Sequence, residues 1–316
     1  MSRSESVRPN ALAVRLIENI SEVFVGKEEV ITQAVVTLIA GGHVLLEDVP
    51  GVGKTLLAKA LAKSISADFK RVQFTADLLP SDITGVTVFS PERQEFVFRK
   101  GPIFANILLG DEINRATPRT QSSLLEAMEE QSVTVDGIAH RLLSPFFVMA
   151  TQNPVELEGT YPLPFAQMDR FMSRLRIGYM DEAAELQMLR NQQFGYALEE
   201  LGAVMDCGTL LRIQEQVRQV EVKDSLREYL LQIVRATREH EGLEYGASPR
   251  GSLDLQTYSQ AFAFLKGRDY LLPDDIKAGA RAVLPHRLIV RRGSRVTAMN
   301  HHAVIDQILE KARVPV

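Results

Sequence analysis

The chain has 316 residues, 45% of them hydrophobic and 24% charged, which is typical of a folded globular protein with room for about two domains. Its net charge of −4 gives no electrostatic basis for sequence-independent binding to DNA or RNA. The single cysteine, Cys207, excludes an intramolecular disulfide framework, and the polar N-terminus without an apolar signal segment adds to the expectation of a cytoplasmic protein.

The first half of the chain alternates short apolar runs with helical patterns, which is typical of a parallel sheet with flanking helices. Helices are expected at Thr55–Ser64 and Gln121–Glu130. The longest apolar run, Ala34–Leu46, is too short to span a bilayer, so no membrane span is expected. The expected strands are His43–Glu47, Arg71–Thr75, Ile107–Asp111, Phe146–Thr151 and Arg174–Tyr179.

Two segments interrupt this alternation and are expected to form hairpins inserted into the α/β core. Ile83–Phe98 is rich in β-prone residues, and its turn is expected near Ser90 and Pro91. Gln131–Ser144 carries an Asp-Gly pair at 136–137, which is a strong signal for a tight hairpin turn.

The strand signal stops after about Tyr179, and the pattern that follows is helical. Asp224 and Pro273 are typical helix-start residues at the beginning of two of these segments. The chain is therefore expected to divide into an α/β domain, residues 1–180, and an all-helical domain, residues 181–316. The expected helices are Glu182–Gln193, Thr209–Gln219, Asp224–His240, Ser252–Lys266, Pro273–Val283 and Ala298–Ala312.

The segment HVLLEDVPGVGKTLLAKA, residues 43–60, predicts a buried strand, a tight glycine turn and a helix that begins near Lys54. Such a turn gathers backbone N–H groups and a helix N-terminus around one point, which suits a triphosphate. The lysine can reach the β- and γ-phosphates and the threonine after it can bind Mg²⁺. The alternative is an ordinary glycine turn with a surface lysine. The residues expected to contact the nucleotide here are Gly51, Val52, Gly53, Lys54, Thr55 and Leu56.

A pair of carboxylates, Asp111 and Glu112, directly follows the apolar run 107–110. Burial of carboxylates is costly unless they are paired or bind a cation. Asp111 at the strand end suits Mg²⁺, directly or through water, and Glu112 suits activation of the attacking water. The alternative is an acidic strand-to-loop exit, which the upstream phosphate loop makes the weaker interpretation.

Three further residues are candidates for the same site. Asn153 ends the strand-like run FFVMATQN, where its amide suits a water near the γ-phosphate, although a turn-forming Asn before Pro154 is the alternative. Arg170 and Arg250 lie beside helix-start features, and either suits charge that develops on a phosphate. A lone arginine is more often a surface ion-pair partner, so the sequence pattern by itself is only weak evidence for a catalytic role of these two arginines.

With these parts in order, the chain resembles an AAA+ ATPase, and more narrowly the MoxR family. The most specific stretches are LLEDVPGVGKTLLAKALAK (45–63), QFTADLLPSDITG (73–85), GDEINRATPRTQSSLLEAMEEQ (110–131) and ATQNPVELEGTYPLPFAQMDRF (150–171). The helical half matches through YGASPRGSLDL and a PDDI stretch. The resemblance implies an AAA+ P-loop core, with a five-stranded parallel sheet, flanking helices and hairpin inserts, followed by an all-helical lid.

The resemblance implies a role for each residue of the phosphate site. Lys54 and Thr55 fall at the Walker A positions, and Asp111 and Glu112 fall at Walker B. Asn153 falls at sensor 1. The implied metal ligands are the Walker A threonine and the Walker B aspartate.

Other residues are assigned by the same resemblance. Arg250 falls at sensor 2 on the helical lid, and Val25 and Gly26 match the segment that lies along the adenine. Arg170 best matches the arginine finger that acts across a subunit interface, with Arg174 as the fallback.

Two positions depart from the expected pattern. Asp48 replaces the general Walker A glycine, although the form EDVPGVGKT looks ordinary for the MoxR family. Phe165 stands where an acidic residue is expected, close to the expected finger.

The resemblance implies Mg²⁺-dependent ATP hydrolysis in a ring, commonly a hexamer, with sites at the subunit interfaces. It also implies chaperone-like remodelling of client proteins, among them metalloenzymes that need activation, and partner proteins with a von Willebrand factor A domain. In this clade, hairpin inserts face the ring pore or the substrate.

Two other functions remain open from the sequence. A nucleic-acid-associated motor would use the same core, and the segment 85–100 carries Arg93, Arg99, Lys100 and three phenylalanines. The net acidity and the lack of an added DNA-binding domain disfavour it. A nucleotide-gated scaffold without turnover is disfavoured because every hydrolytic position is filled.

Overall fold

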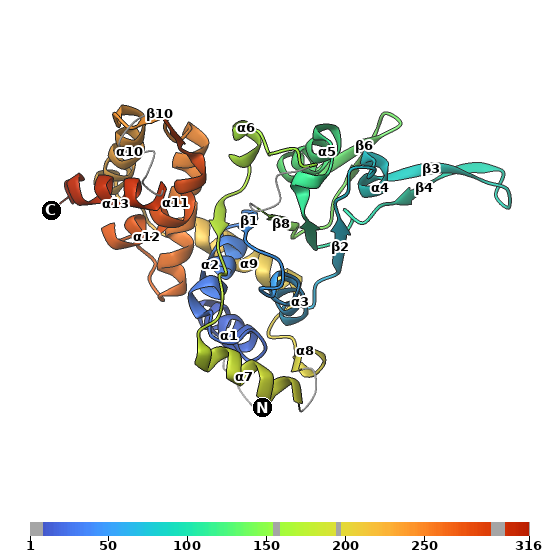
Figure 1. The fold of residues 1–316 in the computed structure, drawn as a ribbon, viewed down its shortest axis with the longest axis horizontal. Helices are drawn as coiled ribbons and strands as arrows, with labels where there is room; N and C mark the ends of the chain where they lie inside the picture. Colours follow the sequence, from blue (N-terminus) through green and yellow to red (C-terminus); the bar gives the residue numbers. More distant parts are fainter. Residues whose placement is uncertain (1–8, 154–158, 194–196, 292–300, 316) are drawn as a thin grey trace, which may run out of the picture.

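The computed structural model describes residues 9–153, 159–193, 197–291 and 301–315. Its centre is a parallel five-stranded sheet with the strand order β2-β5-β8-β1-β9 (Figure 1). All five expected strands are present, although β2 begins and ends two residues before the expected range 71–75 and β9 is shorter than expected. The strands are β1 (Val44–Glu47), β2 (Phe69–Gln73), β5 (Ile107–Asp111), β8 (Phe147–Gln152) and β9 (Ser173–Leu175).

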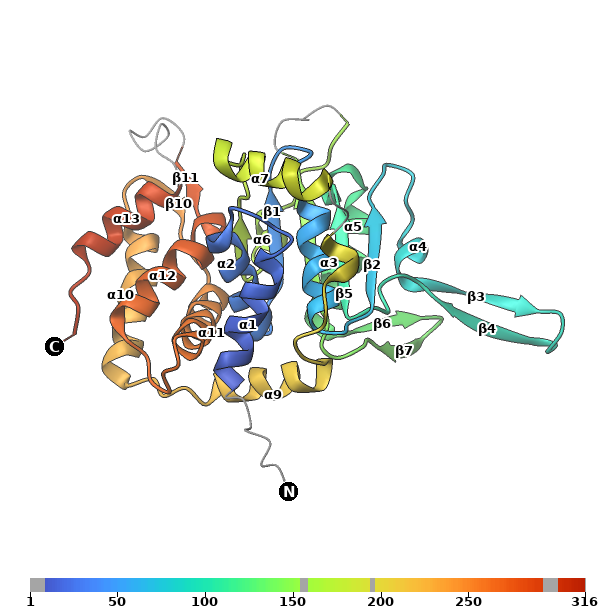
Figure 2. The same ribbon diagram turned by 90° about the horizontal axis from the view of Figure 1, so that it is seen from below.

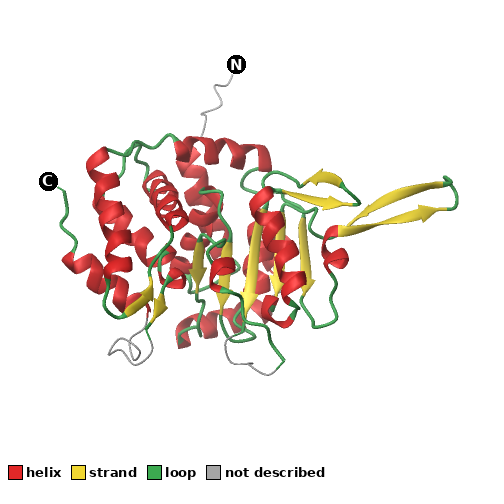
Figure 3. Cartoon of the chain, turned by 90° about the horizontal axis from the view of Figure 1, so that it is seen from above, coloured by secondary structure: helices red, strands yellow, loops and turns green. Residues whose placement is uncertain are grey.

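Helices cover both faces of the sheet (Figure 3). Successive residues of β5 show this, because Ile107 and Leu109 pack into one hydrophobic cluster and Leu108 packs into another. Side chains alternate between the faces of a strand, so each cluster occupies one face. The first cluster includes α1 (Pro9–Ser21), α2 (Glu28–Ile39) and α3 (Lys54–Ser64), and the second includes α5 (Pro118–Glu130).

Both expected hairpins are inserted into this core. The short helix α4 (Pro80–Thr84) leads into β3 (Gly85–Ser90) and β4 (Glu95–Lys100), which pair antiparallel and project from the body of the molecule (Figure 2). The second hairpin joins β6 (Ser132–Val135) to β7 (Ile138–Arg141). Its turn residues at 136 and 137 both have positive φ, 49° and 77°, as a tight hairpin turn requires.

The second half of the chain is largely helical. Helix α11 begins at Pro249, three residues before the expected range, because the hydroxyl of Ser248 caps the helix by accepting the N–H of Gly251. Residues 298–300, where the last helix was expected to begin, lie outside the described residues. A ribbon of β10 (Leu243–Tyr245) and β11 (Ile289–Val290) was not predicted. The helices are α7 (Glu182–Gln193), α8 (Ala197–Glu200), α9 (Cys207–Arg218), α10 (Asp224–Glu239), α11 (Pro249–Leu265), α12 (Pro273–Val283) and α13 (His301–Lys311).

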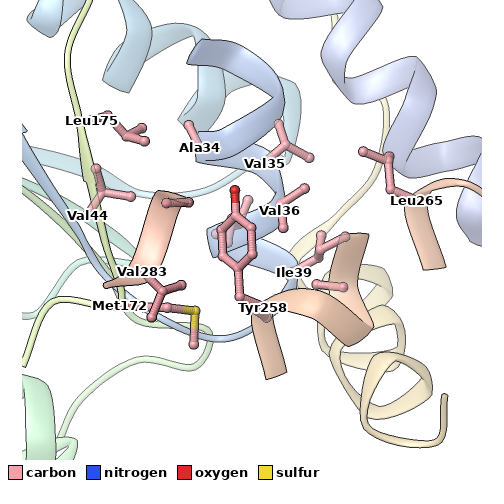
Figure 4. Packing of buried hydrophobic residues seen from close by; sticks show 14 of the residues in the cluster. Ala34, Val35, Val36, Ile39, Val44, Met172, Leu175, Tyr258, Leu265 and Val283 are labelled. Carbon is pink, nitrogen blue, oxygen red and sulfur yellow. The ribbon is translucent and has the colours of Figure 1, made fainter. Parts of the chain in front are cut away.

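Helix α2 joins the sheet to the lid. Figure 4 shows residues of α2, such as Val35 and Ile39, packed among Val44 of β1, Tyr258 of α11 and Val283 of α12. One continuous hydrophobic cluster therefore crosses the expected boundary at 180, and the division into residues 1–180 and 181–316 stays a prediction.

The described helices were also compared with what a membrane span requires. None of them combines sufficient length with sufficient hydropathy to cross a bilayer.

Candidate active site

The loop after β1 turns sharply into α3. Gly51 and Gly53 have φ values of 86° and 93°, a conformation that residues with a side chain rarely adopt. A Cβ atom at Gly53 would lie 2.9 Å from the Phe24 ring, so this position also requires glycine for space. The first turn of α3 leaves its backbone N–H groups without partners in the helix, as an anion site needs.

Asp48 ties the loop to a distant segment. Its Oδ2 accepts the backbone N–H of Gly178 at 2.6 Å, and its Oδ1 accepts the N–H of Val49 at 2.8 Å. Its carbonyl oxygen accepts a hydrogen bond from Lys54 Nζ at 2.7 Å. Burial lowers the pKa of Lys54, and the carboxylates of Asp111 and its neighbours oppose that shift. The residue that departs from the glycine pattern thus braces the loop.

The paired carboxylates at the end of β5 are held by the neighbouring strand β8. Thr151 Oγ1 donates to Asp111 Oδ1 at 2.6 Å and accepts the backbone N–H of Glu112 at 2.8 Å. Glu112 has a φ of 57°, which is uncommon for a residue with a side chain. The threonine therefore fixes both residues where β5 ends.

Strand β2 contributes two polar side chains that contact the same carboxylates. Arg71 donates to Asp111 Oδ2 from Nη2 at 2.6 Å and from Nε at 3.2 Å. Gln73 Nε2 donates to Glu112 Oε2 at 2.8 Å. The Asp111 carboxylate is thus held from both neighbouring strands, and the Glu112 carboxylate is held from β2.

These groups surround a cavity of about 410 Å³. Asn153, which follows β8, is only 4% exposed and also borders this cavity. The structure therefore brings together the phosphate loop, the paired carboxylates and Asn153, as the sequence predicts. The lining residues are Pro50, Gly51, Gly53, Lys54, Thr55, Arg71, Gln73, Asp111, Glu112 and Asn153.

A second, smaller cavity of about 230 Å³ also borders the phosphate loop and shares Pro50 and Gly51 with the lining of the first cavity. Its mixed apolar lining suits a nucleotide base. The expected adenine segment is close by, since a Cβ atom at Gly26 would lie 2.4 Å from Ala184 Cβ on α7. Leu56 packs against the core instead of lining either cavity. The lining residues are Pro50, Gly51, Val52, Gly178, Tyr179, Met180, Glu185 and Met188.

The two expected arginines lie together at the opposite edge of the sheet. Arg170 and Arg250 both pair with Glu129 of α5, at 3.1 Å and 3.0 Å. Arg170 follows α6 (Phe165–Met168) and precedes β9, whereas the phosphate loop follows the end of β1. Since β1 and β9 are parallel, the arginine pair and the phosphate loop occupy opposite edges.

Arg174 has a different environment from Arg170. It lies within β9, its side chain is 10% exposed, and its guanidinium pairs with Glu47 at 3.3 Å. Burial lowers its pKa, and Glu47 opposes that shift. Arg174 therefore belongs to an internal ion pair, whereas Arg170 reaches the surface. Phe165, at the start of α6, is partly buried.

Comparisons with known proteins agree with this geometry. The family model described as ATPase family associated with various cellular activities (AAA) matches residues 43–173, and the AAA lid domain model matches residues 235–308. Chaperone MoxR1 of Mycobacterium tuberculosis is 38% identical over 310 residues, which cover 95% of this chain and 82% of that protein. The chain belongs to the MoxR family of AAA+ ATPases.

Two further similarities extend over nearly the whole of this MoxR-family chain. Protein YeaC of Bacillus subtilis is 49% identical over 316 residues, which are 100% of this chain and 98% of that protein. The crystal structure of a candidate ATPase from Cytophaga hutchinsonii matches with a TM-score of 0.90 at 38% identity, covering 98% of this chain and 96% of that one. The chain is thus an ATPase with the AAA+ fold and a lid.

The side chains of this MoxR-family ATPase fit a nucleotide with Mg²⁺. The Thr55 hydroxyl and the Asp111 carboxylate are oxygen ligands of the kind that Mg²⁺ prefers, and they line the same cavity as Lys54. Asp111 Oδ2 already contacts a cation, the guanidinium of Arg71.

Sequence reasoning missed several residues of this ATPase site. Arg71 and Gln73 stand at alternate positions of β2, a pattern that predicts a shared face but not which strand lies beside it. Tyr179, Met180 and Met188 line the second cavity, and no pattern in the sequence links them to the phosphate loop.

Proposed function

We propose that this ATPase couples Mg²⁺-dependent hydrolysis of ATP to the remodelling or activation of client proteins within a ring of subunits. The observation that carries the proposal is the separation between the phosphate loop at one sheet edge and the pair Arg170 and Arg250 at the other. In a ring, interfaces are heterologous, so one edge of a subunit meets the opposite edge of its neighbour. Each complete site then combines residues of two subunits.

The chemistry follows from side chains around the first cavity. Lys54 stabilises the negative charge of the β- and γ-phosphates, and Glu112 takes the proton of the attacking water. Asn153 orients that water. Thr55 and Asp111 are the residues that would hold Mg²⁺, which supplies further neutralisation of phosphate charge when bound.

The substitution Glu112→Gln tests the proposed base. The amide can still accept the hydrogen bond from Gln73 but cannot take a proton, so we expect turnover to fall at least about 100-fold with ATP affinity nearly unchanged. Nucleotide titration and phosphate release measure the two effects. Glu126→Gln, on an exposed part of α5, is the control. Unchanged turnover would remove Glu112 from this role.

The proposed division of the site between subunits has its own test. Arg170→Ala is expected to abolish hydrolysis while its own phosphate loop still binds ATP. Mixing it with Lys54→Ala, whose arginines are intact but whose loop is disabled, should restore activity. If the mixture stays inactive, the arginine does not act across an interface.

The projecting hairpin supports a protein client. Phe89 and Phe96 are 49% and 74% exposed, and their rings lie 5.4 Å apart. Exposed aromatic pairs suit an apolar protein segment. The similarity to a protein named as a chaperone supports a protein client. We extend the proposal to metalloenzyme clients and to a partner with a von Willebrand factor A domain, as the resemblance to the MoxR family implies.

The same hairpin also suits a second candidate function, a nucleic-acid motor, because Arg93, Arg99 and Lys100 lie near its aromatic residues. Glu92 and Glu95 lie among these cations and disfavour it. ATPase activity that rises with DNA and falls steeply with salt would favour the motor over the remodeller.

A further inference from the structure

Arg287 is buried, with 1% of its surface exposed, although it carries a charge. Its Nε donates to Asp169 Oδ1 at 2.7 Å, and its Nη2 donates to a carboxylate oxygen of Asp254. The remaining donors reach backbone carbonyl oxygens, those of Met172 at 3.2 Å, Val283 at 2.9 Å, Asp169 at 3.0 Å and Phe171 at 2.9 Å. All three nitrogens are used, as a buried guanidinium requires.

These partners come from two parts of the protein. Asp169 lies in the segment that leads into β9 of the sheet, whereas Asp254 lies on α11 of the lid. Arg287 itself ends the short 3₁₀ turn Pro285–Arg287 after α12. One guanidinium therefore links the edge of the sheet to the lid helices.

The same cluster borders both surface arginines. Arg170 directly follows Asp169, whose Oδ2 accepts a hydrogen bond from Ser248 Oγ at 2.7 Å. Ser248 caps α11, and Arg250 stands in the first turn of that helix, one turn before Asp254. The backbones that carry the two arginines are thus fixed to a single buried ion cluster.

We propose that Arg287 is a positioning residue that holds Arg170 and Arg250 in one arrangement, so that both reach the nucleotide of the neighbouring subunit as a unit. This inference rests on the proposed function. Binding must order the backbone as well as the side chain of each arginine, and a backbone that is already fixed removes the first of these entropy costs. Glu129 adds a shared carboxylate between the two guanidinium groups.

Two changes test the role of the cluster. Arg287→Lys keeps the charge but has one donor nitrogen in place of three, so it cannot replace all the hydrogen bonds to the two carboxylates and the backbone carbonyl oxygens. Ser248→Asp preserves the helix cap and places a carboxylate against Asp169, whereas Ser248→Asn preserves the cap and a donor. The Ser248 pair keeps the test valid if Arg287→Lys does not fold. Arg281→Lys is the matched control, since Arg281 pairs with Asp306 on the surface.

We expect Arg287→Lys and Ser248→Asp to lower kcat for ATP at least about tenfold with KM nearly unchanged, because their own phosphate loops are intact. Ser248→Asn and Arg281→Lys should keep kcat within about twofold of the unaltered protein. The decisive measurement mixes each impaired variant with Lys54→Ala subunits. Random mixing in equal amounts places an intact arginine edge against an intact phosphate loop at about a quarter of the interfaces, so activity should return to that extent.

Three outcomes would overturn the inference: unchanged kcat in both impaired variants, a rise in KM that accounts for the loss, or a loss that Lys54→Ala subunits do not complement. The mixture of Arg170→Ala with Lys54→Ala is the reference. If the reference mixture fails as well, the proposed action across the interface is wrong. If only the reference mixture regains activity, the role assigned to Arg287 is wrong and the proposed action across the interface stands.

Discussion

The side chain of Arg71 on β2 reaches diagonally across to Asp111 on the neighbouring strand β5, and its guanidinium donates two hydrogen bonds, at 2.6 Å and 3.2 Å, to one carboxylate oxygen. The carboxylate proposed to hold Mg²⁺ therefore already has a cation beside it. Binding of the metal ion must compete with this ion pair or move the arginine toward the phosphates.

Competition leads to the first prediction. Arg71→Gln should lower the Mg²⁺ concentration that gives half-maximal ATPase activity by about two- to fivefold, the range expected for a partly exposed ion pair. Titration of Mg²⁺ at saturating ATP measures this. Lys70→Gln, on the opposite face of β2, controls for the loss of a positive charge. An increased Mg²⁺ requirement would mean that Arg71 assists the metal site.

The second prediction concerns the position where the general phosphate-loop pattern has glycine. Asp48→Gly should weaken nucleotide binding about tenfold, because the loop loses its hydrogen bonds to Gly178 and Val49. The nucleotide affinity of Asp48→Asn should lie between those of the unaltered protein and Asp48→Gly, since one amide oxygen remains as an acceptor. Titration with a fluorescent nucleotide measures the affinities. Equal or tighter binding by the glycine variant would contradict a bracing role for Asp48.

The third prediction separates Arg174 from Arg170. Arg174→Ala should lower the free energy of unfolding by about 1–3 kcal/mol, because it breaks a largely buried pair with Glu47. Arg176 also pairs with Glu47 but is 57% exposed, so Arg176→Ala should cost less than about 1 kcal/mol. Urea unfolding measures both. Arg174 would instead be the finger if Arg174→Ala has unchanged stability but no ATPase activity, and if mixing it with Lys54→Ala subunits restores that activity.

The fourth prediction is a pH dependence of stability. Burial lowers the pKa of His43 from 6.5 to about 4, and its Nδ1 must be unprotonated to accept the N–H of Val148 at 3.1 Å. The unfolded chain then binds more protons between these values. This stabilising contribution is complete above about pH 6.5 and decreases as pH falls toward 4, by up to about 3 kcal/mol.

His286 also contributes to the loss of stability as pH falls, because burial lowers its pKa as well. His43→Gln should therefore reduce the slope of unfolding free energy against pH between 4 and 6.5 without abolishing it. Urea unfolding at several pH values measures the slope. An unaltered slope would show that His43 has the same pKa in the folded and unfolded chains.

The parts of the fold that follow local rules could be predicted from the sequence. The central strands are continuous apolar runs, and the glycine turn into α3 has a characteristic spacing, so both could be placed. The ribbon β10–β11 could not, because strands of three and two residues have no detectable period and pair across a long stretch of chain.

The candidate site divides in the same way. Lys54, Asp111 and Glu112 stand at the ends of predictable strands and turns, so parallel topology alone brings them to one edge. The contact of Asp48 with Gly178 depends on β9 lying next to β1, which no local pattern specifies. The shared partner Glu129 is likewise a product of tertiary packing between α5 and the lid.

The position of α2 has a consequence for how the protein unfolds. Its apolar side chains contact strand residues on one side and lid residues such as Tyr258 on the other, and all of them belong to one hydrophobic cluster (Figure 4). A fragment that ends near residue 180 would leave part of that surface in water, and we expect it to aggregate. The catalytic half and the lid should accordingly melt in a single cooperative transition.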